Sequence, residues 1–190
     1  ESGKIYINGQ EVDIKNPMDA VKHGIGYLSE DRKRYGIVVG KSVAENSTMA
    51  TMDEFTNGPF INKKKENDIA QKYVESLKTK TPSVDQLVVN LSGGNQQKVV
   101  IAKWLVRNCD ILIFDEPTRG IDVGAKSEIY HLMNELVAAG KSIIMISSEM
   151  TEILRMSDRI MVMCEGRVTG EIGIAEATQE RIMHAATLRK

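Results

Sequence analysis

The chain has 190 residues, with 25 lysines and arginines against 26 aspartates and glutamates, which gives a formal net charge of −1. A chain of this length buries roughly 70% of its unfolded surface, so we expect one domain, with or without an inserted subdomain, and no need for disulfides or a structural metal. The charge balance argues against a dedicated nucleic-acid binder. The charged fraction of 27% argues against wholesale disorder. No apolar run approaches the roughly 20 residues that span a bilayer.

The two cysteines and the N-terminal residues indicate the compartment of the protein and whether the chain is complete. Cys109 and Cys164 form no C-x-x-C pair, so we expect no disulfide framework and a reducing compartment. No charged-then-apolar segment at the N-terminus indicates a secretory signal. Residue 1 is Glu rather than Met, so we expect the chain to be a fragment of a longer protein.

The first elements in chain order are a hairpin and a short helix. Residues 4–7 and 11–14 alternate around the turn dipeptide Asn8-Gly9, which predicts an antiparallel hairpin. Asn16-Pro17 is typical of a helix cap followed by Pro at the first helical position, with Gly24 as the helix stop. Residues 25–28 are predicted to form a short strand.

The next segment is predicted to be helical. Ser42 and Glu45 have capping-box spacing, which predicts a helix from about Val43. Residues 61–79 are predicted to form a helix with solvated lysines, and Thr81-Pro82-Ser83 breaks it.

After Gly94 the pattern changes to alternating helix and strand. Two continuous apolar runs predict fully buried strands, and the best helix has apolar residues at positions 129, 132, 133, 136 and 137. The predicted elements are a helix over 96–107, a strand over 111–114, a helix over 123–139, a strand over 142–146, a helix over 149–156, a hairpin over 160–172 and a helix from Thr178. This order indicates an α/β fold with a parallel sheet covered on both faces.

Two predicted strands end in side chains that can do chemistry. Asp115 can hold Mg²⁺ beside the phosphates of a nucleotide, and Glu116 can activate a water as a general base. A hydroxyl of Ser147 or Ser148, at the end of the other strand, is expected to reach toward the same phosphate. Taken alone, the acidic pair is equally compatible with a strand running into a helix cap.

A glycine-bearing turn precedes the helix predicted over 96–107. Residues 91–98 read Leu-Ser-Gly-Gly-Asn-Gln-Gln-Lys. Ser92 is expected to cap the helix, while Gly93 and Gly94 allow a ligand to approach the backbone and its exposed amides. An isolated Ser-Gly-Gly would more simply be a flexible turn.

Together these segments resemble the ATP-binding cassette (ABC) proteins over essentially the whole chain. Residues 91–98 are similar to the family's signature motif, 111–116 to its Walker B strand and 117–122 to its D-loop. The resemblance implies a P-loop NTPase-like parallel sheet flanked by helices, with an N-terminal antiparallel hairpin and an inserted helical subdomain at about 41–91. It also implies ATP and Mg²⁺ as cofactors. The implied site residues are Asp115 at the metal, Glu116 and Ser148 in catalysis, and Leu91, Ser92, Gly93, Gly94, Gln96, Asp122 and Glu30 at the nucleotide.

Finer features resemble the second cassette of bacterial monosaccharide importers of the ribose, galactose and xylose type. These features are Asn95 in the signature, the run 115–122 and the run Ser29-Glu30-Asp31-Arg32-Lys33. The resemblance implies three partners: an N-terminal cassette in the same chain, membrane permease subunits and, indirectly, a periplasmic sugar-binding protein. It places the protein peripherally on the cytoplasmic face of the membrane.

The family's phosphate loop, Gly-x-x-x-x-Gly-Lys-Ser/Thr, is missing. Gly36 to Ser42 has one residue too few between its glycines, and Gly140-Lys141-Ser142 lies between a helix and a strand, the reverse of the required context. We therefore expect residues 1–190 to be a truncated ABC ATP-binding domain that lacks Walker A. We expect this piece alone to bind ATP weakly or not at all.

Two substitutions predict unequal catalytic sites. Glu30 stands where most cassettes have a glutamine, and it cannot donate an amide hydrogen bond. Ser148 stands where most have the switch histidine, while His23, His131 and His184 are expected to be structural or exposed. Because family cassettes pair head to tail, we expect the main catalytic role of this cassette to be that its signature binds the nucleotide held by the other cassette. The alternatives are a degenerate, non-hydrolysing regulatory cassette and a soluble ABC ATPase.

Overall fold

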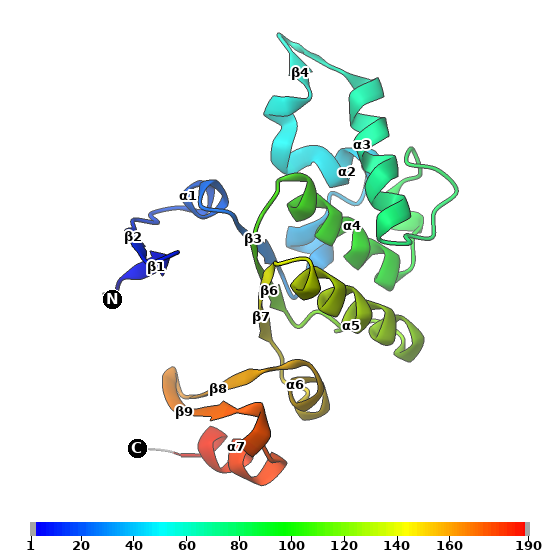
Figure 1. Cartoon of the computed structure of the whole chain (residues 1–190). Helices are drawn as coiled ribbons and strands as arrows, with labels where there is room; N and C mark the ends of the chain where they lie inside the picture. The colour runs from blue at the N-terminus through cyan, green and yellow to red at the C-terminus, as the bar shows by residue number, and fades with distance from the viewer. Residues whose placement is uncertain (1–2, 189–190) are drawn as a thin grey trace. The chain divides into compact units, whose positions relative to one another are not determined.

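The computed structural model describes residues 3–188 and divides the chain into two compact units, residues 1–144 and residues 145–190. Figure 1 shows the elements of each unit along the chain. Each unit has its own helices and strands and is described by itself. Among the described residues, every helix is too short or too polar to cross a bilayer.

The N-terminal elements form as the sequence predicts. Strands β1 (Ile5–Ile7) and β2 (Gln10–Val12) pair antiparallel, and the turn residues Asn8 and Gly9 have φ values of 51° and 78°. Positive φ at both turn residues is the geometry that Asn-Gly favours. Helix α1 (Pro17–Lys22) follows, and the Asn16 side chain accepts a hydrogen bond from a first-turn amide.

A three-stranded sheet belongs mostly to the first unit, and its last strand continues past residue 144 into the second. Its strands are β3 (Ile25–Leu28), β6 (Ile111–Asp115) and β7 (Ser142–Ile146), in the order β3-β6-β7. Strands β3 and β6 are parallel, with Ile25 opposite Ile111 and Leu28 opposite Phe114. The segment after β3 therefore starts beside the end of β6, where the acidic pair stands.

Burial alternates along these strands, so the prediction of fully buried strands with both faces covered is wrong for the described residues. Leu28, Leu112 and Phe114 are completely buried on the face that helix α4 covers, whereas Tyr27 is 47% exposed and Ile144 is 53% exposed. Successive side chains of a strand point to opposite faces, so the alternation marks a sheet that is packed on one face.

Three helices pack together between β3 and β6 in the sequence. They are α2 (Val43–Thr48), α3 (Lys63–Ser76) and α4 (Gly93–Val106), and Figure 1 shows them side by side. Shorter elements connect them: a π-helical turn (Arg32–Gly36), 3-10 segments (Met49–Glu54 and Val88–Asn90) and strands β4 (Thr56–Asn57) and β5 (Phe60–Ile61). The helix predicted over 61–79 starts later because β5 occupies its first residue, while the capping box of α2 is confirmed.

Helix α5 (Val123–Ala138) closely follows the predicted 123–139 range. Its buried residues include the predicted Ile129, Leu132, Met133 and Leu136. Val137 is 49% exposed, so this member of the predicted stripe does not belong to the core. The buried stripe is narrower than predicted because residue 137 is the last but one residue of the helix.

The second unit is a hairpin packed against two helices. It contains α6 (Met150–Met156), β8 (Arg159–Cys164), β9 (Arg167–Gly173), a 3-10 turn (Ile174–Glu176) and α7 (Gln179–Ala186). The core consists of Ile160, Val162, Ile172, Ile182 and Ala185, with Met150, Ile153 and Leu154 packed against it. These elements confirm the helix, hairpin and terminal helix predicted for this region.

Candidate functional site

Asp115 is the last residue of β6 and lies at the carboxyl end of the parallel strands. The Tyr27 hydroxyl on the neighbouring strand donates a hydrogen bond to Asp115 Oδ2 at 2.6 Å. This bond, together with burial, raises the pKa of Tyr27 above its ordinary value. Tyr27 therefore fixes one carboxylate oxygen of the predicted metal ligand.

Glu116 has a left-handed backbone conformation, with φ of 46°. Residues other than glycine adopt this region seldom, and where they do the conformation is held by its surroundings. The Glu116 carbonyl accepts a hydrogen bond from the Arg119 amide at 3.1 Å, which closes the turn after β6. The chain therefore turns immediately after Asp115.

The loop at residues 117–122 is tied to the segment that follows β3. Glu30 forms an ion pair with Arg119. The Arg32 guanidinium donates hydrogen bonds to the carbonyl oxygens of Arg119 at 3.0 Å and Gly120 at 3.4 Å. Glu30, predicted at the nucleotide, thus lies against the loop that resembles the D-loop.

Ser92 occupies the N-cap position of α4 but does not cap the helix with its side chain, so that prediction is wrong. Its hydroxyl instead accepts a hydrogen bond from Asn95 Nδ2 at 2.9 Å, while Asn95 Oδ1 accepts one from the Lys80 amide. Helix α4 begins at Gly93, three residues before the predicted start. The first-turn amides of α4 are consequently left uncapped by a side chain.

Both glycines of the turn are in close contact with the chain itself. A Cβ built on Gly93 would lie 2.6 Å from an Arg32 guanidinium nitrogen and 3.1 Å from the Gly120 carbonyl oxygen. A Cβ on Gly94 would lie 2.8 Å from the Ala125 Cβ. Protein groups thus lie close to both glycines, and the approach of a ligand to their backbone stays a prediction.

Gln96 and Asp122, both predicted at the nucleotide, make structural hydrogen bonds. The Gln96 amide is 4% exposed and donates to the carbonyl oxygens of Val88 and Leu91, both at 3.2 Å. Asp122 accepts a hydrogen bond from the Ala125 amide at 2.9 Å and so caps α5. These contacts hold the two segments that lead into α4 and α5.

The serine pair after β7 belongs to the second unit. The Ser147 hydroxyl donates to Glu152 at 2.5 Å and accepts from the Glu149 amide at 3.0 Å. Ser148, the residue at the predicted switch position, is exposed. The Ser147 hydroxyl therefore holds the start of α6.

Asp115 is the carboxylate that ends β6, and Glu116 follows it in the turn. The described residues contain no group of three or more His, Cys, Asp or Glu side chains placed to hold a metal. Mg²⁺ is commonly held by one or two carboxylates together with substrate phosphates, so Asp115 fits such a site. His23, His131 and His184 are all exposed, as predicted.

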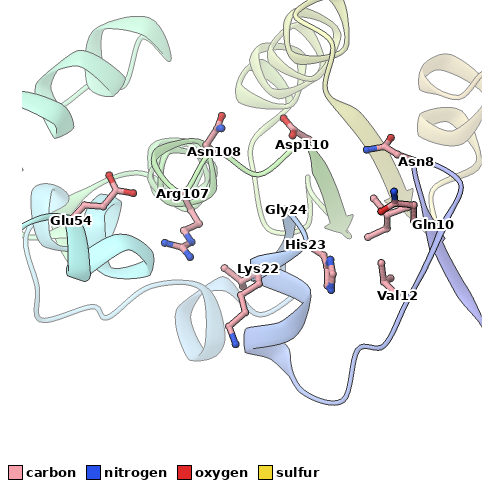
Figure 2. Close-up of a pocket in the computed structure, with 12 residues that line it drawn as sticks. Asn8, Gln10, Val12, Lys22, His23, Gly24, Glu54, Arg107, Asn108 and Asp110 are labelled. Atoms are coloured by element: carbon pink, nitrogen blue, oxygen red, sulfur yellow. The ribbon is translucent and has the colours of Figure 1, made fainter.

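A cavity of the first unit lies away from this edge. It has a volume of about 770 Å³, and Figure 2 shows His23, Gly24 and Asp110 among its lining residues. Gly24 and Asp110 immediately precede β3 and β6, so the cavity lies at the amino ends of the strands. None of the predicted site residues lines it.

Sequence reasoning missed Tyr27, Arg32 and Arg119. Tyr27 pairs with Ile113, two residues before Asp115, and a long side chain reaches such a diagonal neighbour, so the strand register contains this signal. Arg32 and Arg119 carry no comparable signal, because their partners are backbone carbonyls or a carboxylate far along the chain.

Comparisons with known proteins agree on one family. The family profile described as ABC transporter matches residues 1–119. A Burkholderia lata protein, provisionally named a ribose/galactose/methyl galactoside import ATP-binding protein, is 60% identical over 191 residues, covering 100% of this chain and 37% of that protein. Xylose import ATP-binding protein XylG of Thermoanaerobacter pseudethanolicus is 57% identical over 187 residues, covering 98% of this chain and 37% of that protein. The chain thus spans little more than a third of the length of these relatives.

Solved structures agree with this result at the level of the fold. An ATP-binding cassette of an ABC transporter superposes with a TM-score of 0.80 at 21% sequence identity, covering 97% of this chain and 77% of that one. A dimeric cassette in a post-hydrolysis state, bound to ADP and Pi, gives a TM-score of 0.72 at 20% identity and covers 91% of this chain and 74% of that one. With the family profile and the curated relatives, these likenesses lead to one conclusion: the chain belongs to the ABC transporter family.

Proposed function

We propose that this chain is part of the ATP-hydrolysing subunit of a bacterial monosaccharide importer and that it contributes the signature segment to a composite nucleotide site. The family match and the sugar-import names of the curated relatives support the proposal. The observation that carries the mechanism is the start of α4, whose first-turn amides have no side-chain cap. Uncapped amides and the positive end of a helix bind an anionic phosphate oxygen.

We further propose how the chain is organised. Residues 1–190 form an ABC ATP-binding domain without its Walker A part, and about 41–91 form a helical subdomain that leads into the signature. The packing of α2 and α3 on α4 supports this division, since the helices before the signature form one body with it. The small core of this body includes Ala44, Ala70 and Val84.

The proposed roles follow from the placement of each residue. Asp115, whose carboxylate is oriented by Tyr27, would hold Mg²⁺, which would neutralise phosphate charge. Glu116 orients the attacking water and takes its proton. Ser148 stands at the switch position, where its hydroxyl lacks the reach and charge of an imidazole. Glu30 faces the nucleotide from beside Arg119.

In the signature, Ser92, Gly93 and Gly94 present their amides and the Ser92 hydroxyl to the phosphate of a neighbouring cassette. Leu91, Gln96 and Asp122 support this surface. Gln96 holds the Leu91 carbonyl in place, and Asp122 caps the helix that packs beside Gly94. The buried Gln96 amide acts through this support rather than by direct contact with ATP.

The partners belong to the same proposal. The N-terminal cassette of the same chain supplies the phosphate loop that faces this signature. Membrane permease subunits hold the cassettes at the cytoplasmic face of the membrane, and a periplasmic sugar-binding protein delivers the sugar. The sugar-import names of the relatives support this assembly.

The test uses the full-length protein with its membrane partners. Gly93→Asp and Ser92→Ala remove signature function, the second without adding bulk, and both are expected to lower sugar transport more than Glu116→Gln. Glu116→Gln in turn is expected to cost less than the matching change in the first cassette. Equal losses from the two glutamate changes would contradict the asymmetry.

A second candidate function, a non-hydrolysing regulatory cassette, is favoured by Ser148 at the switch position. It predicts that Glu116→Gln leaves hydrolysis unchanged.

Calorimetry of residues 1–190 with Mg-ATP should show weak binding or none, and micromolar binding would contradict a domain that lacks its phosphate loop.

A further inference from the structure

Arg32 joins three segments that are far apart in the sequence. Its guanidinium donates to the carbonyl oxygens of Arg119 at 3.0 Å and Gly120 at 3.4 Å, and its Nε donates to Gln96 Oε1 at 3.4 Å. Three of the five N–H donors of the guanidinium are engaged in this way. The planar fork of arginine suits several acceptors at fixed angles, which the single ammonium of lysine does not.

The backbone of Arg32 is itself anchored to α4. Arg32 opens the π-helical turn Arg32–Gly36, and the Asp31 side chain accepts a hydrogen bond from the Arg34 amide at its start. At the end of the turn, the Gly36 carbonyl accepts a hydrogen bond from Lys103 Nζ at 2.7 Å. Lys103 lies within α4, so the arginine reaches the tip of α4 from a turn that is fixed to the body of the same helix.

The Arg32 guanidinium fills the space beside Gly93. A Cβ at this glycine would lie 2.6 Å from an Arg32 nitrogen, closer than real Cβ contacts occur. Through Gln96, Arg32 also reaches the Leu91 carbonyl on the other side of the tip. Burial lowers the pKa of Arg32, in accord with a guanidinium enclosed by these groups.

We propose that Arg32 is a positioning residue that holds the tip of α4 and the loop at residues 117–122 in one fixed arrangement. The inference rests on the proposed function, in which both segments face the nucleotide held by the neighbouring cassette. Arg32 acts through the segments and does not touch ATP. A fixed tip lowers the barrier to reaction after ATP has bound, so its loss reduces kcat for ATP hydrolysis and leaves KM for ATP nearly unchanged.

The experiment measures ATP hydrolysis by the full-length protein in complex with its membrane subunits. Arg32→Ala is expected to lower kcat by about tenfold with KM within about twofold, and Arg32→Lys, which keeps the charge but not the fork, recovers part of the loss. The matched control is Arg34→Ala, in the same turn, because Arg34 is exposed and its side chain lies over the neighbouring Tyr35. The control is expected to stay within about twofold of the parent protein.

A double-mutant cycle tests the contact with Gly93. Gly93→Ala displaces the Arg32 guanidinium. The loss of kcat caused by Gly93→Ala is therefore expected to be smaller in the Arg32→Ala variant than in the parent protein. Hydrogen exchange gives a readout independent of catalysis: Arg32→Ala should speed exchange of residues 91–96 and 117–122 while that of α3 is unchanged.

Two outcomes would overturn the inference. In the first, Arg32→Ala has the same kcat and exchange rates as Arg34→Ala; in the second, the effects of Gly93→Ala and Arg32→Ala on kcat multiply independently in the double variant. Absence of hydrolysis in the parent protein would instead contradict the proposed function, and the exchange experiment would still decide the role of Arg32.

Discussion

At the scale of single residues, the hydrogen bond between Tyr27 and Asp115 sets the orientation of the carboxylate proposed to hold the metal. The phenolic oxygen lies 2.6 Å from Asp115 Oδ2. Without this bond the Asp115 side chain is free to rotate, so metal binding must also supply the free energy needed to order it. A hydrogen bond to a charged group contributes about 1.5–3 kcal/mol, so the effect is large enough to measure.

We therefore predict that Tyr27→Phe raises the Mg²⁺ concentration for half-maximal ATP hydrolysis by about tenfold in the full-length protein. The matched control is Tyr35→Phe, because Tyr35 is 65% exposed and its ring lies against Arg34. A titration of hydrolysis against Mg²⁺ checks both variants, and an unchanged midpoint for Tyr27→Phe would show that the bond does not serve the metal.

The candidate site was only partly predictable from the sequence. Asp115 and Glu116 were found because an apolar run that ends in acidic residues indicates where a strand ends. The Tyr27 bond depends on which residue of β3 pairs with which residue of β6, and the Arg32 bonds go to backbone carbonyls. No local pattern specifies contacts between residues nearly 90 positions apart.

At the scale of secondary-structure elements, the capping box of α2 makes stability depend on pH. The Ser42 amide donates to Glu45 Oε2 at 2.9 Å, and Glu45 also pairs with Lys41. These bonds lower the pKa of Glu45 to about 2. The stabilisation is present in full above the ordinary glutamate value of 4.5 and is lost as the pH falls toward about 2.

We predict that Ser42→Ala costs about 1 kcal/mol at neutral pH. The parent should be more stable than Glu45→Gln at neutral pH, and this difference in the free energy of unfolding should shrink as the pH falls below about 4.5. The reason is that protonation removes the charge of Glu45, which Gln lacks at every pH. Urea unfolding of both variants between about pH 7 and pH 3 measures these differences, and a constant difference over this range would contradict the assigned role of Glu45.

The contact between α4 and α5 depends on a glycine. A Cβ at Gly94 would lie 2.8 Å from the Cβ of Ala125, so Gly94→Ala forces the two helices apart. We expect a loss of about 1–3 kcal/mol in the free energy of unfolding, as is usual for an overpacked contact. Gly40→Ala is the control, since a Cβ there meets no atom within 4 Å. Chemical denaturation compares the two, and equal stabilities would show that the helices adjust freely.

Helix positions were predicted well because their signals are local. The caps at Asn16 and Ser42 both act as the sequence indicates. The burial of the strands was not predicted correctly, because an apolar run has the same appearance whether one face or both faces are covered. Ser92 failed as a cap because a neighbouring amide, Asn95 Nδ2, engages its hydroxyl instead.

At the scale of the whole molecule, the division into two units predicts separate responses to destabilisation. Ile182 on α7 is 4% exposed in the core of the second unit. Ile182→Ala should cost about 2–5 kcal/mol within that unit. Hydrogen exchange should then accelerate at residues 145–188 and stay unchanged in α4.

The control for this prediction is Met183→Ala, one residue further along α7, where the side chain is 51% exposed. It should change the free energy of unfolding by no more than about 0.5 kcal/mol. Faster exchange in α4 upon Ile182→Ala would show that the two units unfold as one.

The two glycines at the start of α4 carry a consequence for how related cassettes are compared. Arg32 and the Gly120 carbonyl crowd the first glycine, and Ala125 crowds the second, all within the same polypeptide. A cassette that no longer hydrolysed ATP would keep the same close contacts at both glycines, so a larger side chain at either position would still disturb its packing. The presence of the Gly-Gly pair therefore indicates that the fold is kept, not that the cassette hydrolyses ATP. Comparisons that separate hydrolysing from non-hydrolysing cassettes should rely on positions 116 and 148 instead.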